Sequence, residues 1–317
     1  MTKRIIVTKA GFIGFHLCQR LAAEGHVLLG IDNFNDYYSP KLKQDRALAL
    51  KQSGVSILEG DICDDLNPLC RSFSPTHCVH LAAQAGVRYS LVNPEACIRS
   101  NIAGFQQVLE LCRSLSCPLI YASSSSVYGR NEKIPFAESD PTDHPASLYG
   151  ATKKSNELMA EAYHHLFHFP TIGLRFFTVY GPWGRPDMAY YQFAEKIMRD
   201  EPIAIYNNGQ MERDFTYIDD IVDGIISTFS IDKGSHLFNL GNHQPIPLLR
   251  FITILEEALG KEALKEYHPM QPGDVVRTFA DISHSQSLLG FSPRTTLEEG
   301  IPKFVAWYRT YHLRKKG

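Results

Sequence analysis

The stretch "VTKAGFIGFHL", residues 7–17, contains the turn on which the rest of the fold is expected to depend. It follows the apolar run at residues 5–7 and continues into a helical pattern, so it reads as a turn between a strand and a helix. Gly11 and Gly14 stand at a spacing that lets the backbone turn tightly and the helix pack close to the strand. Backbone N–H groups at such a helix N-terminus can bind a phosphate. The stretch therefore predicts a phosphate-binding turn, although no glycine precedes Gly11 within it.

Short apolar runs alternate with helical patterns through the first half of the chain. Such alternation is typical of a parallel sheet with helices on both faces. Strands are expected over residues 5–7, 26–32, 55–59, 77–81, 118–122 and 171–176, and helices over 15–24, 102–114 and 149–169. In the last of these helices, Leu158, Ala162 and Leu166 recur at every fourth position. We predict an α/β fold with a Rossmann-type doubly wound parallel sheet.

The composition changes after Phe177, and residues 180–192 are rich in Pro, Trp, Gly, Tyr and Met. Helical patterns resume at 249–259 and 301–308. We expect residues 1–178 to form the domain that contains the sheet, with a return segment near 214–242. Residues 179–317 are expected to form mainly a smaller C-terminal α/β substrate-binding domain, with a cleft between the two domains.

The composition limits the possible partners and locations. Of the 317 residues, 44% are hydrophobic and 21% are charged, as is usual for a globular protein. The formal net charge of -2 provides no basic surplus for nucleic acid, and no apolar run approaches the ~18 residues of a membrane span. The chain enters a strand-like run at residues 5–7 and its seven cysteines form no C-x-x-C pair. We therefore expect a cytoplasmic protein with no nucleic-acid partner, no membrane partner and no metal site.

Polar and small residues follow the predicted strands at one edge of the sheet, where open α/β folds bind ligands. Asp32 ends the second strand, 18 residues after Gly14, which is close to the spacing of ~20 for a carboxylate that holds an adenosine ribose. A carboxylate there favours NAD over NADP, because it would repel a 2′-phosphate. Asp32 could alternatively cap a turn. The other residues expected at the cofactor site are Gly11, Phe12, Ile13, Gly14, Asn33, Asn35, Asp61, Ile62, Leu81, Ala82, Ala83, Gln84 and Asn101.

Tyr149 and Lys153 stand four residues apart in a predicted helix, which places both side chains on one helix face. A neighbouring ammonium and an oxidised nicotinamide both favour the phenolate, so Tyr149 could act as a general base. The serine run at residues 123–126 follows the strand at 118–122, and a hydroxyl there can bind a substrate oxygen and relay its proton. Alone, Y-x-x-x-K would indicate a solvated helix face; with the serines and the N-terminal turn, it predicts a catalytic site.

These motifs resemble those of the extended short-chain dehydrogenase/reductase superfamily, and within it the chain is similar to the UDP-glucuronate 4-epimerase branch. The resemblance runs nearly from end to end. The similar stretches include "DNFNDYY" (32–38), "HLAAQAGVRYSLVNP" (80–94), "ASSSSVYG" (122–129), "SLYGATKKSNELMA" (147–160), "GLRFFTVYGPWGRPDMA" (173–189), "RDFTYIDDIV" (213–222) and "PMQPGDVVRTFAD" (269–281). The resemblance implies NAD as the cofactor, a UDP-sugar as the substrate, and a homodimer.

The resemblance also implies a reaction, the C4 epimerisation of UDP-glucuronate to UDP-galacturonate through a 4-keto intermediate. Tyr149 would remove the proton of the C4 hydroxyl while C4 gives its hydride to NAD, and Lys153 would orient the nicotinamide ribose. Ser124 stands at the active-site Ser/Thr position of the family. Ser125 and Ser126 are expected to contact the sugar or its carboxylate.

A 4-keto hexuronate is a β-keto acid, which loses CO₂ unless its carboxylate is held. Related decarboxylases typically carry Glu at the position of Ser126, so the serine favours epimerisation without decarboxylation. Arg185 is the first candidate for a carboxylate clamp and Arg88 the second, although Arg185 could instead hold a diphosphate or its own loop. The other expected substrate contacts are Thr178 at the sugar, Arg213 and Arg277 at the diphosphate, Asp274 at the uridine ribose, and Tyr191, which could equally be a core aromatic.

The family pattern V-T-G-x-x-G-F-I-G is one residue longer than V-T-K-A-G-F-I-G in this chain. A non-glycine residue adopts the unusual φ of the first glycine at a cost on the order of 1 kcal/mol, about a fivefold loss in affinity. Lys9 could add a cation near the pyrophosphate. Two other functions stay open: another UDP-sugar 4-epimerase or a UDP-glucuronate decarboxylase, and a non-catalytic nucleotide-binding protein with a degenerate glycine loop.

Overall fold

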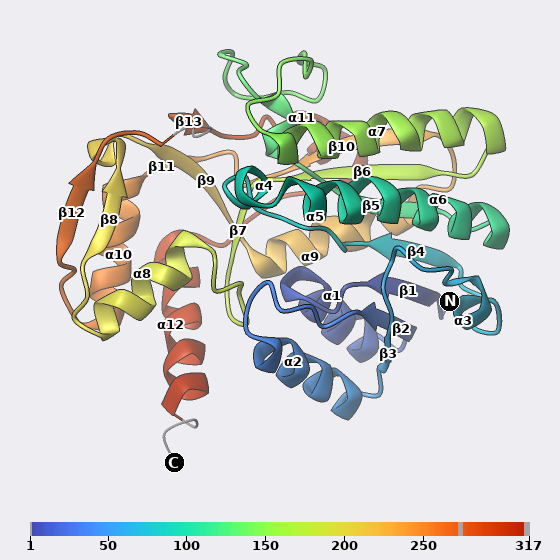
Figure 1. Ribbon diagram of the computed structural model, residues 1–317, viewed down its shortest axis with the longest axis horizontal. Coiled ribbons are helices and arrows are strands. Elements are labelled where there is room, and N and C mark those ends of the chain that lie inside the picture. Colours follow the sequence, from blue (N-terminus) through green and yellow to red (C-terminus); the bar gives the residue numbers. More distant parts are fainter. Residues whose placement is uncertain (1, 272–274, 314–317) are drawn as a thin grey trace.

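A seven-stranded parallel sheet forms the centre of the computed structural model, which describes residues 2–271 and 275–313 (Figure 1). The strand order is β10-β6-β5-β4-β1-β2-β3, and every neighbouring pair is parallel. The strands are β1 (Arg4–Thr8), β2 (Val27–Asp32), β3 (Ser56–Glu59), β4 (His77–His80), β5 (Leu119–Ser124), β6 (Thr171–Phe176) and β10 (Ser235–Leu240). The predicted Rossmann-type sheet is confirmed.

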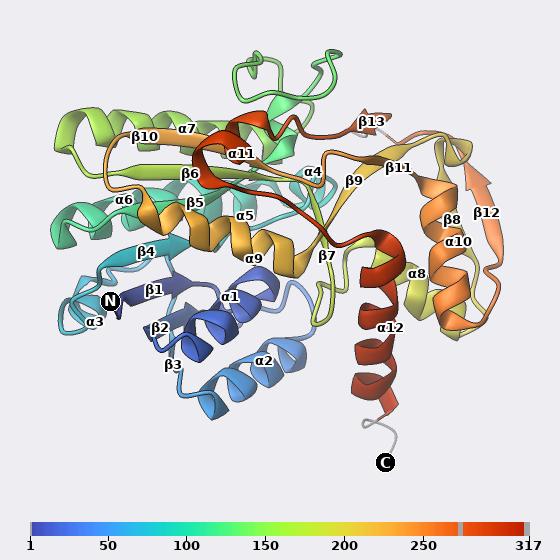
Figure 2. The same cartoon turned by 180° about the vertical axis from the view of Figure 1, so that it is seen from behind.

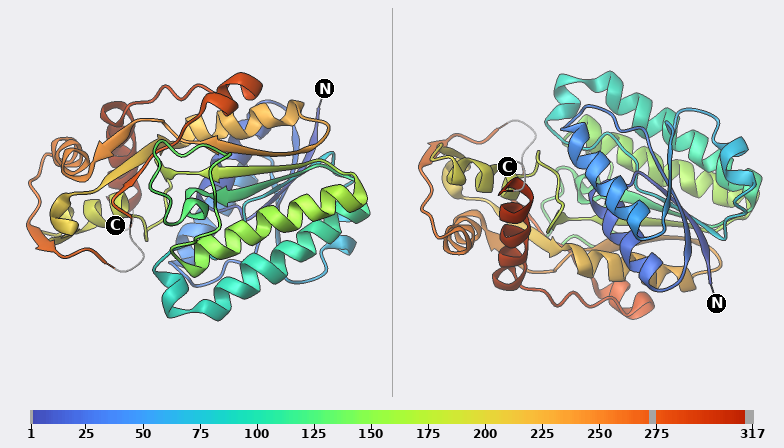
Figure 3. Two further views of the ribbon diagram at one scale, coloured as in Figure 1. Left: turned by 90° about the horizontal axis from the view of Figure 1, so that it is seen from above. Right: turned by 90° about the horizontal axis from the view of Figure 1, so that it is seen from below.

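Helices cover both faces of this sheet, as the views from the front and from behind show (Figures 1 and 2). On one face α7 (Leu148–Phe167) packs against α6 (Gly104–Leu115), and α6 also contacts the short α3 (Asn67–Arg71). On the other face α1 (Phe12–Ala23) contacts both α2 (Pro40–Gln52) and α9 (Ile218–Ser227). Figure 3 shows the three layers from above and from below.

A smaller part beside the sheet contains the remaining strands. β9 (Glu212–Tyr217) pairs with β7 (Thr178–Tyr180), β11 (Pro245–Pro247) and β13 (Arg277–Thr278), and β8 (Ile203–Tyr206) pairs with β12 (Lys265–His268). Its helices are α8 (Ala189–Met198), α10 (Leu248–Leu259) and α12 (Leu297–Leu313), and α10 packs against the other two. Between β9 and β11 the chain returns to the large sheet as α9 and β10, so the sheet's last strand comes from the second half of the sequence.

Short helical segments connect these elements. They are α4 (Tyr89–Val92), α5 (Pro94–Ile98), the π-helical turn η1 (Arg99–Ala103), the 3₁₀ turns η2 (Ser125–Tyr128), η3 (Asn207–Gly209) and η4 (Thr228–Ser230), and α11 (Ser283–Leu289). In the described ranges, no helix combines the length and the apolar character that a membrane crossing requires. The same residues contain no group of three or more His, Cys, Asp or Glu side chains arranged to hold a metal ion.

The start of α1 and the presence of α2 are among the points at which the structure differs from what the apolar pattern predicts. The helix expected from residue 15 begins at Phe12, because Gly11 takes an extended conformation and directly precedes the first turn. The helix α2 was not predicted, since its sequence has no clear apolar period. It buries Lys43 and Arg46 along with its few apolar side chains, so two of the residues on its inner face are basic.

The apolar stripe of α7 lies on the outer face of the helix. Leu158 and Leu166 are 61% and 62% exposed, although a stripe at this spacing usually marks the buried face of a helix. The face toward the sheet instead contains buried polar side chains, among them Lys153, Asn156 and Glu157. The helix was therefore predicted correctly, but its apolar stripe does not pack against the sheet.

A buried ion pair fixes α7 to the sheet. Arg175 in β6 donates from Nε to Oε1 of Glu157 at 2.8 Å and from Nη2 to Oε2 at 2.9 Å, and both side chains are at most 2% exposed. Ser123 donates to the same carboxylate at 2.7 Å, and Arg175 also donates to the Tyr128 hydroxyl at 3.0 Å. Burial by itself would raise the pKa of Glu157. The hydrogen bonds and the positive charge of Arg175 have the opposite effect and outweigh burial, so the pKa is lowered and the carboxyl stays ionised.

We expect Arg175→Met to lower the free energy of unfolding by about 3–5 kcal/mol, because it leaves the Glu157 carboxylate buried without its counter-charge. Urea unfolding followed by circular dichroism measures this loss. The double variant Arg175→Met/Glu157→Met should regain most of it. Since the pair lowers the folded-state pKa of Glu157, its stabilisation is present above the ordinary glutamate pKa of 4.5 and is lost as the pH falls through the folded-state value. A double variant less stable than Arg175→Met would contradict this account.

Candidate active site

The turn between β1 and α1 depends on the backbone of Lys9, which has a positive φ of 67°. The Lys9 carbonyl oxygen lies 2.2 Å from the point where a Cβ on Gly14 would stand, so this position requires glycine. The helix starts right after Gly11 without a side-chain cap, and its first N–H groups have no partner within the helix. The side chain of Phe12 is buried in the core and that of Ile13 is partly buried against it. These two residues can therefore contact a ligand at the turn through their backbone N–H groups. The shortened turn thus keeps the features of an anion site.

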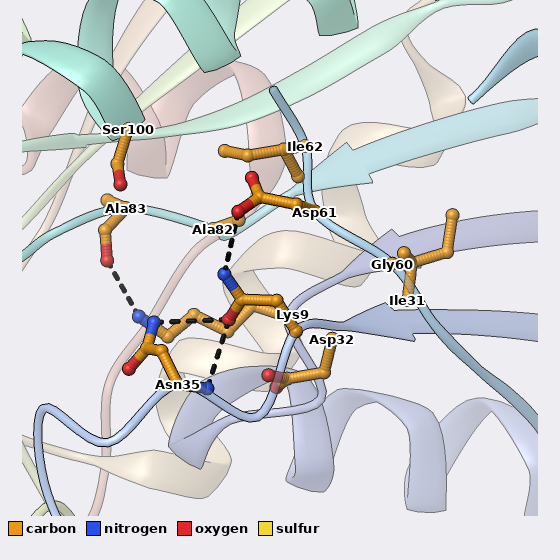
Figure 4. Close-up of a pocket in the computed structure, with 11 residues that line it drawn as sticks. Lys9, Ile31, Asp32, Asn35, Gly60, Asp61, Ile62, Ala82, Ala83 and Ser100 are labelled. Atoms are coloured by element: carbon orange, nitrogen blue, oxygen red, sulfur yellow. Dashed lines mark hydrogen bonds between the residues drawn. The ribbon is translucent and has the colours of Figure 1, made fainter. Parts of the chain in front are cut away.

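A pocket opens at the carboxyl ends of the neighbouring strands, beside this turn (Figure 4). It brings together many of the residues expected at a cofactor site, and also Lys9, Ile31 and Ser100. Its lining consists of Lys9, Ile31, Asp32, Asn33, Asn35, Gly60, Asp61, Ile62, Ala82, Ala83 and Ser100. Ile31 and Ser100 were not singled out in the sequence. The π-helical turn η1 supplies Ser100, and no sequence pattern indicated that turn.

Asp32 at the end of β2 has one oxygen occupied and one without a partner. Oδ1 accepts a hydrogen bond from the backbone N–H of Phe34 at 2.9 Å, which caps the turn. Oδ2 is buried and has no hydrogen-bond partner among the described residues. A buried carboxylate oxygen without a donor is costly, and a ribose hydroxyl would satisfy it. Asn33, which donates to Asp61 at 3.2 Å, and Asn35, which donates to Asn33 at 3.1 Å, complete this side of the pocket.

Asn101 in η1 holds the end of β4 against α7. Its Oδ1 accepts from the Gln84 N–H at 2.8 Å, and its Nδ2 donates to the Gln84 carbonyl at 3.1 Å and to Thr152 at 3.0 Å. The backbone N–H of Leu81 donates to the carbonyl of Thr8 at 3.3 Å, so both ends of residues 81–84 are held. The buried Nε2 of Gln84 has no partner in the described part of the chain. Asn101 therefore positions the segment that carries Gln84, and Gln84 keeps a donor for a ligand.

Tyr149 in the first turn of α7 and Ser124 at the end of β5 share a side-chain hydrogen bond. Burial raises the pKa of Tyr149, while the bond with Ser124 and the positive charge of Arg185 lower it without cancelling the effect of burial. Lys153 was expected to supply that charge. Its ammonium instead donates to the Ala122 carbonyl at 2.9 Å, and burial lowers its pKa to about 8. Among the described residues, the positive charge that lowers the pKa of Tyr149 is that of Arg185.

The serine turn η2 sits against the start of α7. The N–H of Ser126 donates to Oγ of Ser124 at 3.1 Å, which orients the Ser124 hydroxyl. A Cβ at Gly150 would stand 2.5 Å from the Ser126 carbonyl oxygen, so glycine permits this close approach. Ser125 and Ser126 are both partly exposed. The turn that contains them packs against the first turn of α7, which contains Tyr149.

The loop at residues 181–187 is tied to the large sheet domain. Arg185 donates from Nε to Oδ1 of Asp187 at 3.0 Å and makes a second bond from Nη2 to Oδ2. The Tyr37 hydroxyl donates to Asp187 at 3.1 Å, and Arg46 donates to the Trp183 carbonyl at 3.1 Å. Arg185 thus holds its own loop, as one of the sequence alternatives had it. The bonds to Asp187 use one N–H of Nε and one of Nη2. Because a guanidinium has five N–H donors, Arg185 also has donors that Asp187 does not use.

Two further candidates for substrate contacts lie at the smaller part of the molecule. The guanidinium of Arg88 lies over the Tyr206 ring at 4.8 Å, which links the start of α4 to β8. Thr178 is partly exposed and begins β7. Both therefore stand where the smaller part meets the large sheet domain.

The remaining candidates for substrate contacts are Arg213 and Arg277, which were expected at the diphosphate, together with Tyr191 and Asp274. Arg213 donates to the carbonyls of Glu212 and Val276, and the half-exposed Arg277 pairs with Glu212 at 2.5 Å. Tyr191 is 3% exposed and hydrogen-bonds with His312 at 2.9 Å, so its packing favours the core-aromatic alternative. Asp274 lies outside the described residues.

The fold and the site together define a nucleotide-cofactor enzyme of the dehydrogenase/epimerase class. The NAD dependent epimerase/dehydratase family matches residues 5–241, about three quarters of the chain, and the chain belongs to this family. UDP-glucuronate 4-epimerase 4 of Arabidopsis thaliana is 47% identical over 333 residues, covering 98% of this chain and 76% of that relative.

Solved structures agree with this assignment. UDP-glucuronic acid 4-epimerase from Bacillus cereus, in complex with UDP-glucuronic acid and NAD, is 36% identical with a TM-score of 0.90, covering 97% of this chain and 99% of that one. MoeE5 in complex with UDP-glucose and NAD is 33% identical with a TM-score of 0.86 and the same coverage. The protein is therefore an NAD-dependent nucleotide-sugar epimerase.

We expect Tyr149→Phe to lower kcat by roughly 10²–10⁴-fold, because it removes the hydroxyl placed for proton transfer. Cofactor binding should persist, since the pocket at Asp32 lies on other elements. Turnover of UDP-sugar and NAD titration measure the two effects separately. Tyr163→Phe on the same helix, whose hydroxyl bonds with Glu110, is the matched control. A Tyr149→Phe enzyme with near wild-type kcat would contradict the assignment.

Proposed function

We propose that the protein interconverts UDP-glucuronate and UDP-galacturonate by epimerisation at C4, through a 4-keto intermediate. The observation that carries the proposal is that Arg185, held in the 181–187 loop by Asp187, has a positive charge that lowers the pKa of Tyr149. A cation beside the base of a C4 epimerase stands near the substituent at the adjacent C5. In a hexuronate that substituent is a carboxylate, the usual partner of a guanidinium.

Tyr149 acts as the base that takes the proton of the C4 hydroxyl and later returns it. Ser124 shares a hydrogen bond with Tyr149, so it can donate to the phenolate oxygen or to the sugar oxygen. Bound NAD would supply a reversible hydride acceptor for C4, so the overall reaction would involve no net oxidation. The buried Lys153 stands on the same helix face, where its ammonium can reach the nicotinamide ribose.

Retention of the carboxylate distinguishes this reaction from decarboxylation. The 4-keto intermediate is a β-keto acid, and cleavage of its C5–C6 bond is slow while the carboxylate is held in a charged, hydrogen-bonded site. We propose that Arg185 holds it through donors that Asp187 does not use, with Ser125 or Ser126 as a second contact. Arg88 and Thr178, at the smaller part of the molecule, are the next candidates along the substrate. Arg213 and Arg277 are proposed at the diphosphate, where Arg277 must exchange Glu212 for a phosphate.

Product analysis with two substrates tests the proposal. The wild-type enzyme should convert UDP-glucuronate to UDP-galacturonate without releasing CO₂ or a UDP-pentose, and should turn over UDP-glucose poorly. Arg185→Met should raise the KM for UDP-glucuronate by about tenfold or more, the scale of one charge-assisted hydrogen bond, and should release some UDP-pentose. The matched control is Arg250→Met, which removes an exposed arginine paired with Glu298.

The same assay separates the alternatives. Conversion of UDP-glucose in preference to UDP-glucuronate would replace the proposal by a UDP-glucose 4-epimerase, and stoichiometric CO₂ release would replace it by a decarboxylase. NAD binding without turnover of either sugar would indicate a non-catalytic nucleotide-binding protein.

A homodimer through the face formed by α6 and α7 is part of the proposal. Leu158 and Leu166 on α7 are more than half exposed, and an apolar stripe of this kind on a catalytic helix is suited to a second copy of the chain. A cytoplasmic location is proposed as well, because all seven cysteines are free.

We expect Leu158→Glu/Leu166→Glu to shift the protein from dimer to monomer, because like charges would face one another across a two-fold interface. Light scattering coupled to size-exclusion chromatography measures the mass. Leu288→Glu changes a leucine of similar exposure on α11 and should leave the mass unchanged. A wild-type monomer, or a double variant that stays dimeric, would exclude this interface.

A further inference from the structure

Lys9 places its amino group inside the cofactor pocket (Figure 4). Its Nζ donates to the carbonyl oxygen of Ala83 at 2.7 Å, so the side chain crosses from the end of β1 to the segment after β4. Its Cγ lies 3.2 Å from the point where a Cβ on Gly11 would stand, so it passes directly beside the start of α1. An NAD pyrophosphate at this helix N-terminus must therefore meet the Lys9 side chain.

Charged residues of both signs act on the Lys9 ammonium, and Asp61 also lines the pocket. Arg185 from the 181–187 loop and Lys43 from α2 repel the ammonium, and Asp32 from β2 and Asp187 attract it. Asp187 is already bound by two donors of Arg185. Burial is the largest influence and, with the two cations, lowers the pKa of Lys9 to about 7. The buried His80 on β4 also faces Lys9, and burial lowers its pKa to about 3, so it stays neutral.

We propose that Lys9 is a pyrophosphate-binding residue, which exchanges the Ala83 carbonyl for the NAD diphosphate and so substitutes for the missing first glycine. Lys9 lies between the two points of the pocket that the adenosine diphosphate part of NAD would contact. Gly11 and Gly14 mark the helix N-terminus on one side, and the unpartnered oxygen of Asp32 marks the ribose on the other. A diphosphate that joins these two points passes the Lys9 ammonium.

The exchange is favoured by charge and permitted by flexibility. The diphosphate adds the attraction between opposite charges, which the neutral Ala83 carbonyl does not supply, so it is the better acceptor for the Lys9 ammonium. The four-carbon stem of lysine lets the ammonium follow the phosphates away from Ala83. A dianion in the pocket is also attracted by Arg185 and Lys43, which repel the Lys9 ammonium.

Proton uptake follows from the same exchange. The diphosphate favours the charged form, so the pKa of Lys9 rises when NAD binds. Below pH 7 the free protein already carries the proton, and binding changes little with pH. Above pH 7 the proton must be taken up, and NAD affinity should fall by up to about tenfold per pH unit until the pKa of the complex is reached.

NAD titration of cofactor-free protein by calorimetry, between pH 6.5 and 9, tests the proposal. Lys9→Met keeps the length of the side chain and removes the charge; it should raise the Kd at pH 7 by about tenfold and make binding nearly independent of pH. Lys9→Arg keeps the charge at every pH and should bind NAD at pH 9 more tightly than wild type does. Lys51→Met, on the exposed surface of α2, is the matched control for net charge and should bind like wild type. Thermal unfolding of each variant verifies that it is folded.

Fragments of the cofactor identify the group that Lys9 contacts. Lys9→Met should weaken ADP as strongly as NAD and leave adenosine unchanged. Equal or tighter NAD binding by Lys9→Met would show that the side chain only obstructs the pocket, and would overturn the proposal. Tighter binding of NADP than of NAD by wild type, lost in Lys9→Met, would assign the ammonium to a 2′-phosphate and would also overturn it. These titrations use no sugar, so their failure is distinct from failure of the proposed substrate.

Discussion

The active site depends on the burial of polar side chains on one face of α7. Buried polar groups must be paired, and those of α7 find their partners on the sheet and on η1: Glu157 with Arg175, Lys153 with the Ala122 carbonyl, and Asn156 with the Asn101 carbonyl. A rotation or shift of the helix would break all three at once. The pairing therefore sets the height of Tyr149 above the end of β5, where its hydroxyl meets Ser124.

The turn between β1 and α1 has one glycine fewer than the family pattern, and it still leaves the first N–H groups of α1 without a partner within the helix. Lys9 takes over the positive φ, and its carbonyl fills the space that glycine leaves open at position 14. The side chain of the same residue enters the pocket beside the turn. The turn thus places a lysine amino group in the pocket.

Two motifs that stand about 150 residues apart meet through Asp187, which accepts from Tyr37 and pairs with Arg185. The contact joins the segment after β2, beside the cofactor pocket, to the loop that precedes α8. The same loop carries Arg185, whose positive charge lowers the pKa of Tyr149. Lys153 is four residues from Tyr149 in sequence, but its ammonium is committed to the Ala122 carbonyl. An electrostatic effect expected within one helix comes instead from a loop of the other part of the molecule.

The sequence by itself determined the parallel sheet, the turn at Gly11 and Gly14, and the position of Asp32 at the end of a strand. These depend on local periodicity and on short spacings, which can be read along the chain. It did not determine α2, the π-helical turn η1, or the outward direction of the Leu158 and Leu166 stripe, because in those segments buried polar groups replace the apolar pattern. Only the tertiary structure decided which charge reaches Tyr149 and where the Lys9 side chain lies. Those outcomes depend on distances between segments far apart in sequence, and burial and charge act through space.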